Sequence, residues 1–367
     1  MKILFTSDVP APYSVDFFDE LGKKCDLTVL FTDKYRASHD RKLQQYSFKH
    51  FNGIFLKGKH FGADRYSFCP EIIDYIKPGI YDRIIICNPS SATGVLAVKH
   101  MQLKKIPYWI MGSRAFAEDP GSIKKQLSAS VYSRAQICLS TCKNQDSYYL
   151  LYGADKNSIR RYPFSSLRNS DILKSVSSYS EKTELRDFLR IEEQRIVVSV
   201  GSFIPRNGAD LLIRAAARFP QEVGFYLIGD EVPEVLIGMK NKLGASNVHF
   251  INNCSRAELL RYYKAADLFC FPSREDNWGI AINEAMAYGL PIITTDRCNA
   301  GVELIENGVN GFVVSAEDVK SLVQKTAAIL SDESMGINMG EASLNIIKEY
   351  TVENMAQIFM GFFKEEK

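Results

Sequence analysis

Short apolar runs alternate with amphipathic helical stretches along the whole chain, and this alternation predicts the secondary structure. The apolar runs are continuous, as strands buried on both faces of a sheet require. Two successive series of strand–helix units predict an α/β protein with two doubly wound, Rossmann-like parallel-sheet domains. In the first half the predicted strands are 2–6, 26–31, 83–87, 107–111 and 136–140, with helices near 13–23, 71–77, 91–103, 121–133 and 145–152. In the second half the predicted strands are 195–200, 223–229, 248–251, 267–271, 291–295 and 311–314, with helices near 208–219, 232–243, 255–266, 280–288 and 301–307.

The strand pattern stops between the two series, near residues 165–184, where serine, asparagine and charged residues become frequent. This break predicts a join between two domains. The expected organisation is a first domain over 1–165, a linker over 166–185, a second domain over 186–350 and a terminal helix over 351–367.

The last segment of the chain has the pattern of an amphipathic helix. Thr351 stands in the N-cap position, and the apolar side chains that follow fall on one helical face. That face carries Met355, Ile358, Phe359, Phe362 and Phe363. An apolar face of this kind must be buried, and we expect the helix to pack back on the first domain.

Composition excludes several classes of protein. The 367 residues are 46% hydrophobic and 24% charged, which is typical of a globular protein and argues against disorder. No window approaches the ~18 uninterrupted apolar residues of a transmembrane helix, and the first residues lack the pattern of a secretion signal. The eight cysteines are scattered, which is typical of reduced thiols in a cytoplasmic protein. Cys138 and Cys142 have the wrong spacing for a redox or zinc motif.

Charge is divided unequally along the chain, although the net charge is only +2. Residues 1–165 contain 24 Lys and Arg against 15 Asp and Glu, a net charge of +9, and residues 166–367 have a net charge of −7. The first half therefore faces an anionic partner, or the two halves complement each other across a cleft. No pattern of a nucleic-acid-binding motif accompanies the charge, so we expect no nucleic acid partner.

One basic and aromatic segment, 40–60, suggests where an anionic partner would bind. We hypothesise that it docks on an anionic membrane surface, which would make the protein peripheral on the inner membrane face. The alternative is a solvated basic loop whose aromatic residues pack inward on their own domain. The residues concerned are Arg41, Lys42, Lys49, Lys57 and Lys59, with Tyr46, Phe48, Phe51 and Phe55 between them.

Several common catalytic motifs are absent from the sequence. The chain has no phosphate-binding P-loop, no GxGxxG fingerprint, no HExxH and no GxSxG. It also has no Asp-x-Asp pair and no histidines at ligand spacing, so we expect no metal site. The informative segment is 273–296, SREDNWGIAINEAMAYGLPIITTD.

This segment is predicted to leave a strand, form a polar loop and enter a helix near Gly279. Asp276 and Glu284 bracket the loop and the first helical turns, while Asn277, Trp278 and Gly279 would present N–H groups at a helix N-terminus. Two carboxylates beside an anion-binding turn suit a ligand that has both hydroxyls and phosphates, such as a nucleotide sugar. The alternative is structural, with Glu284 as a surface residue of the helix and Asp276 as a loop cap.

The spacing Asp276-NWGIAIN-Glu284, followed by Ala-Met-Ala, resembles the E-x7-E signature of glycosyltransferase family 4. Members of that family are retaining enzymes of the GT-B fold, in which two Rossmann-like domains face a cleft. The resemblance covers the whole second half and is looser in the first, where it is greatest to bacterial members that build polysaccharides. The similar segments are 198–215, 289–296 and 300–314, with 1–22 and 150–166 in the first half.

The resemblance implies a role for each residue of the signature. Glu284 would accept hydrogen bonds from the ribose hydroxyls of the donor, each worth ~1.5–3 kcal/mol. Asp276 would hold hydroxyls of the transferred sugar, and Asn277, Trp278 and Gly279 would line the sugar and phosphates. The family's nucleobase pocket corresponds to the turn at Asn252, Asn253 and Cys254.

One departure from the family pattern concerns the donor diphosphate. Family members commonly place an Arg and a Lys in the loop after the first strand of the second domain, and the matching residues here are Ser202 and Asn207. Arg206 is the only cation left in that loop. Either Arg206 reaches the diphosphate, or backbone N–H groups and the helix N-terminus neutralise it, or the donor site is weak or inactive.

Together these observations predict a retaining, metal-independent glycosyltransferase that uses a nucleoside diphosphate sugar as co-substrate and no other cofactor. The acceptor would be a hydroxyl of a glycan or lipid-linked glycan, bound by the first domain near Pro10, Tyr13 and Arg114. One alternative is a catalytically silent GT-B-fold subunit that binds a nucleotide sugar or serves as a scaffold. Another is a nucleotide-sugar epimerase of the same fold.

Overall fold

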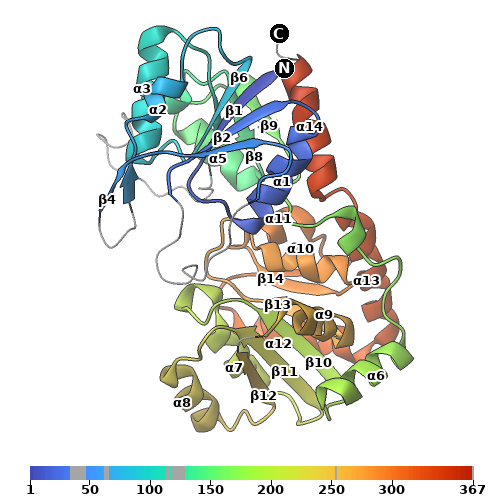
Figure 1. The fold of residues 1–367 in the computed structure, drawn as a ribbon. Helices are drawn as coiled ribbons and strands as arrows, with labels where there is room; N and C mark the ends of the chain where they lie inside the picture. Colours follow the sequence, from blue (N-terminus) through green and yellow to red (C-terminus); the bar gives the residue numbers. More distant parts are fainter. Residues whose placement is uncertain (34–46, 62–65, 113–115, 117–128, 253, 366–367) are drawn as a thin grey trace. The chain divides into compact units, whose positions relative to one another are not determined.

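The computed structural model describes residues 1–33, 47–61, 66–112, 116, 129–252 and 254–365. The chain divides into two compact units. One unit contains residues 1–166 together with 351–367, and the other contains residues 167–350. Each unit is built around a parallel sheet of its own (Figure 1).

The sheet of the first unit has seven strands, and every neighbouring pair is parallel. Its strand order is β3-β2-β1-β6-β7-β8-β9, and β4 and β5 form a separate antiparallel pair. The strands are β1 (Lys2–Ser7), β2 (Asp26–Phe31), β3 (Asn52–Phe55), β4 (Lys59–Phe61), β5 (Tyr66–Phe68), β6 (Arg83–Cys87), β7 (Trp109–Met111), β8 (Ile137–Ser140) and β9 (Ile159–Arg161). The helices are α1 (Pro12–Gly22), α2 (Ile72–Tyr75), α3 (Ala92–Lys104), α5 (Lys143–Leu151) and α14 (Val352–Glu365).

The five strands predicted in the first half correspond to β1, β2, β6, β7 and β8. The two edge strands, β3 and β9, have no counterpart in the prediction because each is short and lacks a continuous apolar run. No strand was predicted within the basic and aromatic segment 40–60, but its residues 52–55 extend the sheet as β3. Residues 121–128 of the predicted helix 121–133 lie outside the described residues.

The C-terminal helix α14 packs on α1 of the first unit, which confirms the prediction for this segment. Its apolar face enters the core formed by β1, α1 and β7. The ring of Phe359 lies 4.9 Å from that of Phe17, and the ring of Phe363 lies 5.4 Å from that of Trp109. The helix is therefore held by the burial of the same residues that define its apolar stripe.

The sheet of the second unit has six parallel strands in the order β12-β11-β10-β13-β14-β15. All six of its strands were predicted from the apolar runs. The strands are β10 (Arg195–Val200), β11 (Val223–Gly229), β12 (Val248–Asn252), β13 (Leu268–Phe271), β14 (Ile292–Thr295) and β15 (Gly311–Val314). The helices are α6 (Tyr179–Leu189), α7 (Ala209–Ala216), α8 (Glu234–Leu243), α9 (Arg256–Ala265), α10 (Ile280–Ala287), α11 (Asn299–Leu304), α12 (Val319–Ser331) and α13 (Glu333–Ile347).

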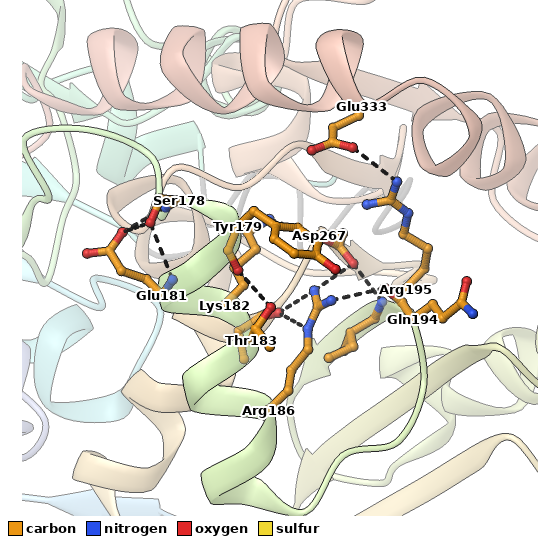
Figure 2. Close-up of polar contacts among 12 residues, drawn as sticks. Ser178, Tyr179, Glu181, Lys182, Thr183, Arg186, Gln194, Arg195, Asp267 and Glu333 are labelled. Carbon is orange, nitrogen blue, oxygen red and sulfur yellow. Dashed lines mark hydrogen bonds and ion pairs between the residues drawn. The ribbon is translucent and has the colours of Figure 1, made fainter.

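A carboxylate whose side chain is 11% exposed, that of Asp267, binds residues at the amino edge of this second sheet, as Figure 2 shows. Asp267 accepts hydrogen bonds from Lys182 (3.1 Å), from Arg186 (2.9 Å) and from the N–H of Ile196 (2.9 Å). Both cations belong to α6, whose first residues overlap the segment predicted as a linker. The paired charges attach α6 to the starts of β10 and β13, at the edge opposite the carboxyl ends of the strands.

The basic and aromatic segment of the first unit combines features of both alternatives. Phe48, Phe51 and Phe55 pack inward, and the rings of Phe48 and Phe55 lie 5.5 and 5.4 Å from that of Phe31. These three rings are therefore not available for insertion among lipid headgroups. The side chains of Lys49, Lys57 and Lys59 are exposed. Docking on an anionic membrane stays a prediction that rests on charge alone, and Arg41, Lys42 and Tyr46 lie outside the described residues.

None of the eight cysteines, all of which lie in the described residues, forms a disulfide. Within the described ranges, no three His, Cys, Asp or Glu side chains come together as ligands of a metal ion. A search of the same residues for a helix long and apolar enough to cross a membrane finds none.

Candidate active site

The strand order of the second sheet reverses between β10 and β13, because β11 and β12 continue from one of these strands and β14 and β15 from the other. Open parallel sheets bind ligands at the carboxyl ends of the strands beside such a reversal. The β10–α7 loop (201–208) and the β13–α10 loop (272–279) both leave this edge. They are in direct contact, since a Cβ on Gly208 would lie 2.1 Å from the carbonyl oxygen of Pro272. These two loops carry most of the predicted donor-binding residues.

Glu284 lies on α10 and is not a solvated surface residue, because its side chain is only 13% exposed. Its Oε2 accepts a hydrogen bond of 3.1 Å from the hydroxyl of Tyr263, and its Oε1 accepts one from Nη1 of Arg256. Tyr263 is completely buried and stacks on Tyr288 at 5.6 Å. Oε2 of Glu284 is therefore held by a buried donor, the Tyr263 hydroxyl, and Oε1 by the more exposed Arg256. A carboxylate offers about four acceptor positions, so Glu284 can still accept hydroxyl donors from a ligand.

Asp276 caps its own loop, as the structural alternative supposed. Its Oδ1 accepts a hydrogen bond of 3.0 Å from the N–H of Trp278. That N–H was expected to face a ligand, but it is already satisfied within the loop. Among the described residues no hydrogen bond reaches Oδ2, and the side chain is half-buried. One oxygen of Asp276 thus stabilises the loop, and the binding of a ligand hydroxyl by the other stays a prediction.

The indole of Trp278 is buried within the second unit, and its place along the sugar and phosphates stays a prediction. It is 5% exposed, and its Nε1 donates a hydrogen bond of 2.8 Å to the buried Asn283. Its ring stacks on that of Tyr350 at 6.3 Å. A buried indole N–H needs an acceptor, and Asn283 on the next helical turn supplies it.

Gly279 is the N-cap residue of α10 and has φ of +99°, a conformation that favours glycine. A Cβ at this position would lie 2.6 Å from Sγ of Cys298, so the loop and the segment after β14 are closely packed. The carbonyl oxygen of Asn277 accepts a hydrogen bond of 3.1 Å from Asn299 of that segment. Among the described residues no side chain caps α10, although the N–H of Ile282 donates a hydrogen bond of 2.9 Å to the carbonyl oxygen of Gly279. Helix starts of this kind can bind anions.

The β10–α7 loop carries Ser202, Arg206 and Asn207, the residues predicted to meet the donor diphosphate. Ser202 and Arg206 are exposed. The amide of Asn207 donates a hydrogen bond of 2.9 Å to the carbonyl oxygen of Ser202, while its buried Oδ1 has no partner among the described residues. Asn207 therefore holds the loop together through its own amide, and Arg206 is the one cation of this loop.

The turn after β12 was assigned to the nucleobase. Asn252 ends β12 and is exposed, and Cys254 is half-buried. Asn253 lies outside the described residues. The ring of Phe203 from the β10–α7 loop packs edge-to-face on Phe250 of β12 at 5.6 Å, which brings the two loops near each other.

The residues predicted for the acceptor belong to the first unit. Pro10 is buried just before α1, and Tyr13 on α1 packs edge-to-face on Phe164 at 5.8 Å. Arg114 lies outside the described residues. A pair that was not predicted stands at the same sheet edge: Asn88 donates a hydrogen bond of 2.9 Å to Asp8, and these residues follow the neighbouring strands β6 and β1.

Three residues near the candidate site were missed from the sequence: Arg256, Tyr263 and Arg274. Arg256 is the first residue of α9, where the helix dipole disfavours a cation, so its placement there was a usable signal. Tyr263 falls on the apolar face of the same helix and gives no signal of its own. Arg274 follows a buried strand at the reversal of strand order, and its contacts depend on three separate loops.

Comparison with known families supports the interpretation of the second unit. Residues 181–345 match the family described as Glycosyl transferases group 1. The chain is 27% identical over 244 residues to the D-inositol 3-phosphate glycosyltransferase of Kribbella flavida, a match covering 62% of this chain and 56% of that protein. It is 24% identical over 185 residues to the N,N'-diacetylbacillosaminyl-diphospho-undecaprenol alpha-1,3-N-acetylgalactosaminyltransferase of Campylobacter jejuni, covering 50% of this chain and 48% of that one. The matches thus span about half the length of these curated relatives.

Solved structures share the fold over the full chain. Anabaena Alr3699/HepE in complex with UDP and glucose has a TM-score of 0.78 at 18% identity, with complete coverage of both chains. WaaG, a glycosyltransferase of lipopolysaccharide biosynthesis, has a TM-score of 0.67 at 18% identity, covering 98% of this chain and 99% of that one. These similarities establish two Rossmann-like parallel-sheet domains of the GT-B type.

Proposed function

We propose that this chain, in which residues 181–345 match the glycosyl transferases group 1 family, transfers a sugar from a nucleoside diphosphate sugar to a hydroxyl of a glycan or lipid-linked glycan. The observation that carries the proposal is the pair Asp276 and Glu284. Both carboxylates are half-buried, both retain acceptor capacity, and both belong to the loop and helix that follow β13 at the reversal of strand order.

In this proposal the Glu284 carboxylate accepts hydrogen bonds from the two ribose hydroxyls of the donor. Tyr263 and Arg256 hold the carboxylate in one orientation before the donor arrives, so less freedom is lost on binding. Asp276 accepts hydroxyls of the transferred sugar through Oδ2, while Oδ1 keeps the loop closed. The uncapped start of α10 and the Arg206 side chain face the phosphates.

Fewer observations support the proposed acceptor than the proposed donor. The Campylobacter relative is named for an acceptor built on diphospho-undecaprenol, a lipid-linked glycan carrier. WaaG, whose fold is similar, is a glycosyltransferase involved in lipopolysaccharide biosynthesis, which is consistent with a glycan acceptor. We assign acceptor recognition to the first unit, near Pro10 and Tyr13, and transfer of a hexose with retention of configuration.

No strong general base is needed for this reaction. In the front-face mechanism implied by the family, the leaving diphosphate itself takes the proton of the acceptor hydroxyl. The protein then contributes alignment of the two substrates and stabilisation of the charge that develops on the diphosphate. Cations and N–H groups of the chain supply that stabilisation, so the reaction proceeds without a divalent metal.

A thermal-shift panel of nucleoside diphosphates and their sugars tests the donor half. A ligand present at 100 times its dissociation constant should add ~2.7 kcal/mol to the free energy of unfolding. The cognate nucleotide should then be incubated as its sugar with candidate acceptors, and the product analysed for anomeric configuration. Failure of every nucleoside diphosphate and nucleotide sugar to stabilise the protein would refute the proposal.

A second candidate, a catalytically silent subunit that binds a nucleotide sugar, is supported by one observation. Neither Ser202 nor Asn207 supplies the positive charge that family members commonly place there, and the Asn207 amide is committed to the loop itself. Saturable donor binding without hydrolysis or transfer to any acceptor would favour this candidate. Release of a free 2-epimer without an acceptor would instead indicate an epimerase.

A further inference from the structure

Arg274 lies at the first turn of the β13–α10 loop and uses every hydrogen-bond donor of its guanidinium. Nη1 donates to the carbonyl oxygen of Pro205 (2.5 Å) and to Asp210 Oδ1 (2.7 Å). Nη2 donates to Asp210 Oδ2 (2.8 Å) and to Glu317 Oε2 (3.3 Å), and Nε donates to Glu317 Oε1. An arginine has five N–H groups, so none is left over. We call Pro205, Asp210, Arg274 and Glu317 the Arg274 clamp.

The two carboxylates of the clamp differ in burial. The side chain of Asp210, in the first turn of α7, is 18% exposed, whereas that of Glu317, in the loop after β15, is 58% exposed. Burial alone would raise the pKa of Asp210, but the hydrogen bonds and charge of Arg274 outweigh burial and hold that pKa below its ordinary value. Asp210 is therefore ionised beside the Arg274 guanidinium, and this bidentate pair, the less exposed of the two, is the stronger half of the clamp.

The main chain strengthens this connection. The carbonyl oxygen of Arg206 accepts hydrogen bonds from the N–H of Arg274 (2.7 Å) and from the hydroxyl of Ser273 (3.2 Å). Arg274 therefore donates hydrogen bonds to two successive carbonyl oxygens of the β10–α7 loop, those of Pro205 and Arg206. The clamp fixes the main chain from which the Arg206 side chain projects.

We propose that Arg274 is a positioning residue for binding of the donor diphosphate, acting through Arg206. This inference rests on the proposed function. Arg274 does not itself contact the donor, because all of its donors are occupied by the protein. It holds the β10–α7 loop against the β13–α10 loop, so that the single cation of the first loop is presented beside the helix start of the second.

The β10–α7 loop needs an anchored main chain because it carries so little positive charge. With serine and asparagine at positions 202 and 207, one exposed arginine must do what two cations commonly do in this family. An exposed arginine on a mobile loop would lose much conformational freedom on binding an anion. Anchoring its main chain beforehand reduces that loss and places the charge within reach of the phosphates.

Binding measurements on four proteins test the proposal: the wild type, Arg274→Ala, Arg274→Lys and, as a matched control, Arg195→Ala. Arg195 pairs with Glu333 at 3.5 Å at the opposite edge of the same sheet. The probes are the nucleoside diphosphate among UDP, GDP, ADP, CDP and dTDP that stabilises the wild type most, and the matching monophosphate. We expect Arg274→Ala to weaken diphosphate binding about tenfold and monophosphate binding less than threefold. Arg274→Lys should recover part of the loss, because lysine can keep one ion pair, and Arg195→Ala should bind as the wild type does.

A double variant separates positioning from general damage. If Arg274 acts through Arg206, then Arg274→Ala should cause no further loss of diphosphate affinity in a protein that already carries Arg206→Ala. Additive losses, equal losses for both nucleotides, or unchanged affinity in Arg274→Ala would each overturn the inference while leaving the proposed function standing. If the wild type binds no nucleoside diphosphate, the proposed function itself fails and the inference fails with it. Should Arg274→Ala not fold, Asp210→Asn keeps the shape of the clamp, and the same pattern of losses is expected of it.

Discussion

Replacing Glu284 with alanine perturbs both the stability of the second unit and the binding of the donor. The carboxylate is the acceptor of the Tyr263 hydroxyl, and Tyr263 is completely buried. Leaving such a hydroxyl without an acceptor costs about 1–3 kcal/mol of the free energy of unfolding. The Arg256 side chain is 55% exposed, so loss of its ion pair should add no more than ~1 kcal/mol.

The effect on nucleotide binding is a separate quantity. If Glu284 accepts hydrogen bonds from the ribose hydroxyls, losing even one such bond to a charged acceptor removes ~1.5–3 kcal/mol of binding free energy. Because 1.4 kcal/mol corresponds to a factor of ten, the dissociation constant of the nucleoside diphosphate should rise at least about tenfold. The control is Glu275→Ala, which removes a carboxylate that is 44% exposed and lies one residue outside the signature.

Urea unfolding and isothermal titration calorimetry measure the two effects independently. In a Tyr263→Phe background the buried hydroxyl is absent, so Glu284→Ala should destabilise the protein by about 1–3 kcal/mol less than it does in the wild type. An unchanged dissociation constant in Glu284→Ala, with the protein folded, would refute the assignment of Glu284 to the ribose. An equal loss of affinity in Glu275→Ala would show that nucleotide affinity depends on the local negative charge and not on the Glu284 carboxylate in particular.

Four other outcomes are expected. Asp276→Asn should spare nucleoside diphosphate binding and lower transfer by at least tenfold, because its proposed contact is to the sugar; equal loss of both in calorimetry and transfer assays would contradict that role. Arg206→Ala should weaken diphosphate binding about tenfold and monophosphate binding little, while Asn207→Lys should strengthen diphosphate binding; no change in either titration would leave the helix start alone to hold the phosphates. Transfer should survive excess chelator, and a loss that added metal restores would show that the reaction needs a metal. Because the pKa of Asp210 is lowered in the folded state, its stabilising contribution should be complete at neutral pH and decline as the pH falls below ~4, so urea unfolding of Asp210→Asn and of the wild type should converge in acid.

The sequence determined the architecture because strands buried on both faces leave an unmistakable record. Runs such as 195–200 and 223–229 are apolar without interruption, and each forms a strand of the second sheet. The C-terminal stripe was equally direct, since Phe359 and Phe363 have no stable position outside a core. The edge strands of the first sheet, β3 and β9, escaped prediction because they carry no continuous apolar run, whereas both edge strands of the second sheet, β12 and β15, carry one.

The spacing of Asp276 and Glu284 predicts the candidate site, and the structure places the two residues in the β13–α10 loop and in α10, after the same strand. What those groups do locally was decided by tertiary contacts. The Trp278 side chain is committed to Asn283, and Asp276 Oδ1 to the loop itself, because a buried N–H needs whatever acceptor the fold brings near.

The charges show the same division between sequence and structure. The sequence shows that Arg206 is the only cation of the β10–α7 loop. No pattern along the chain reveals which residues hold that loop in place. Arg274 meets Asp210, 64 positions earlier, and Glu317, 43 positions later. Such pairs form only when parallel strands bring the loops at their carboxyl ends together, since hydrogen-bond geometry depends on distance in space and leaves no periodic trace in the chain.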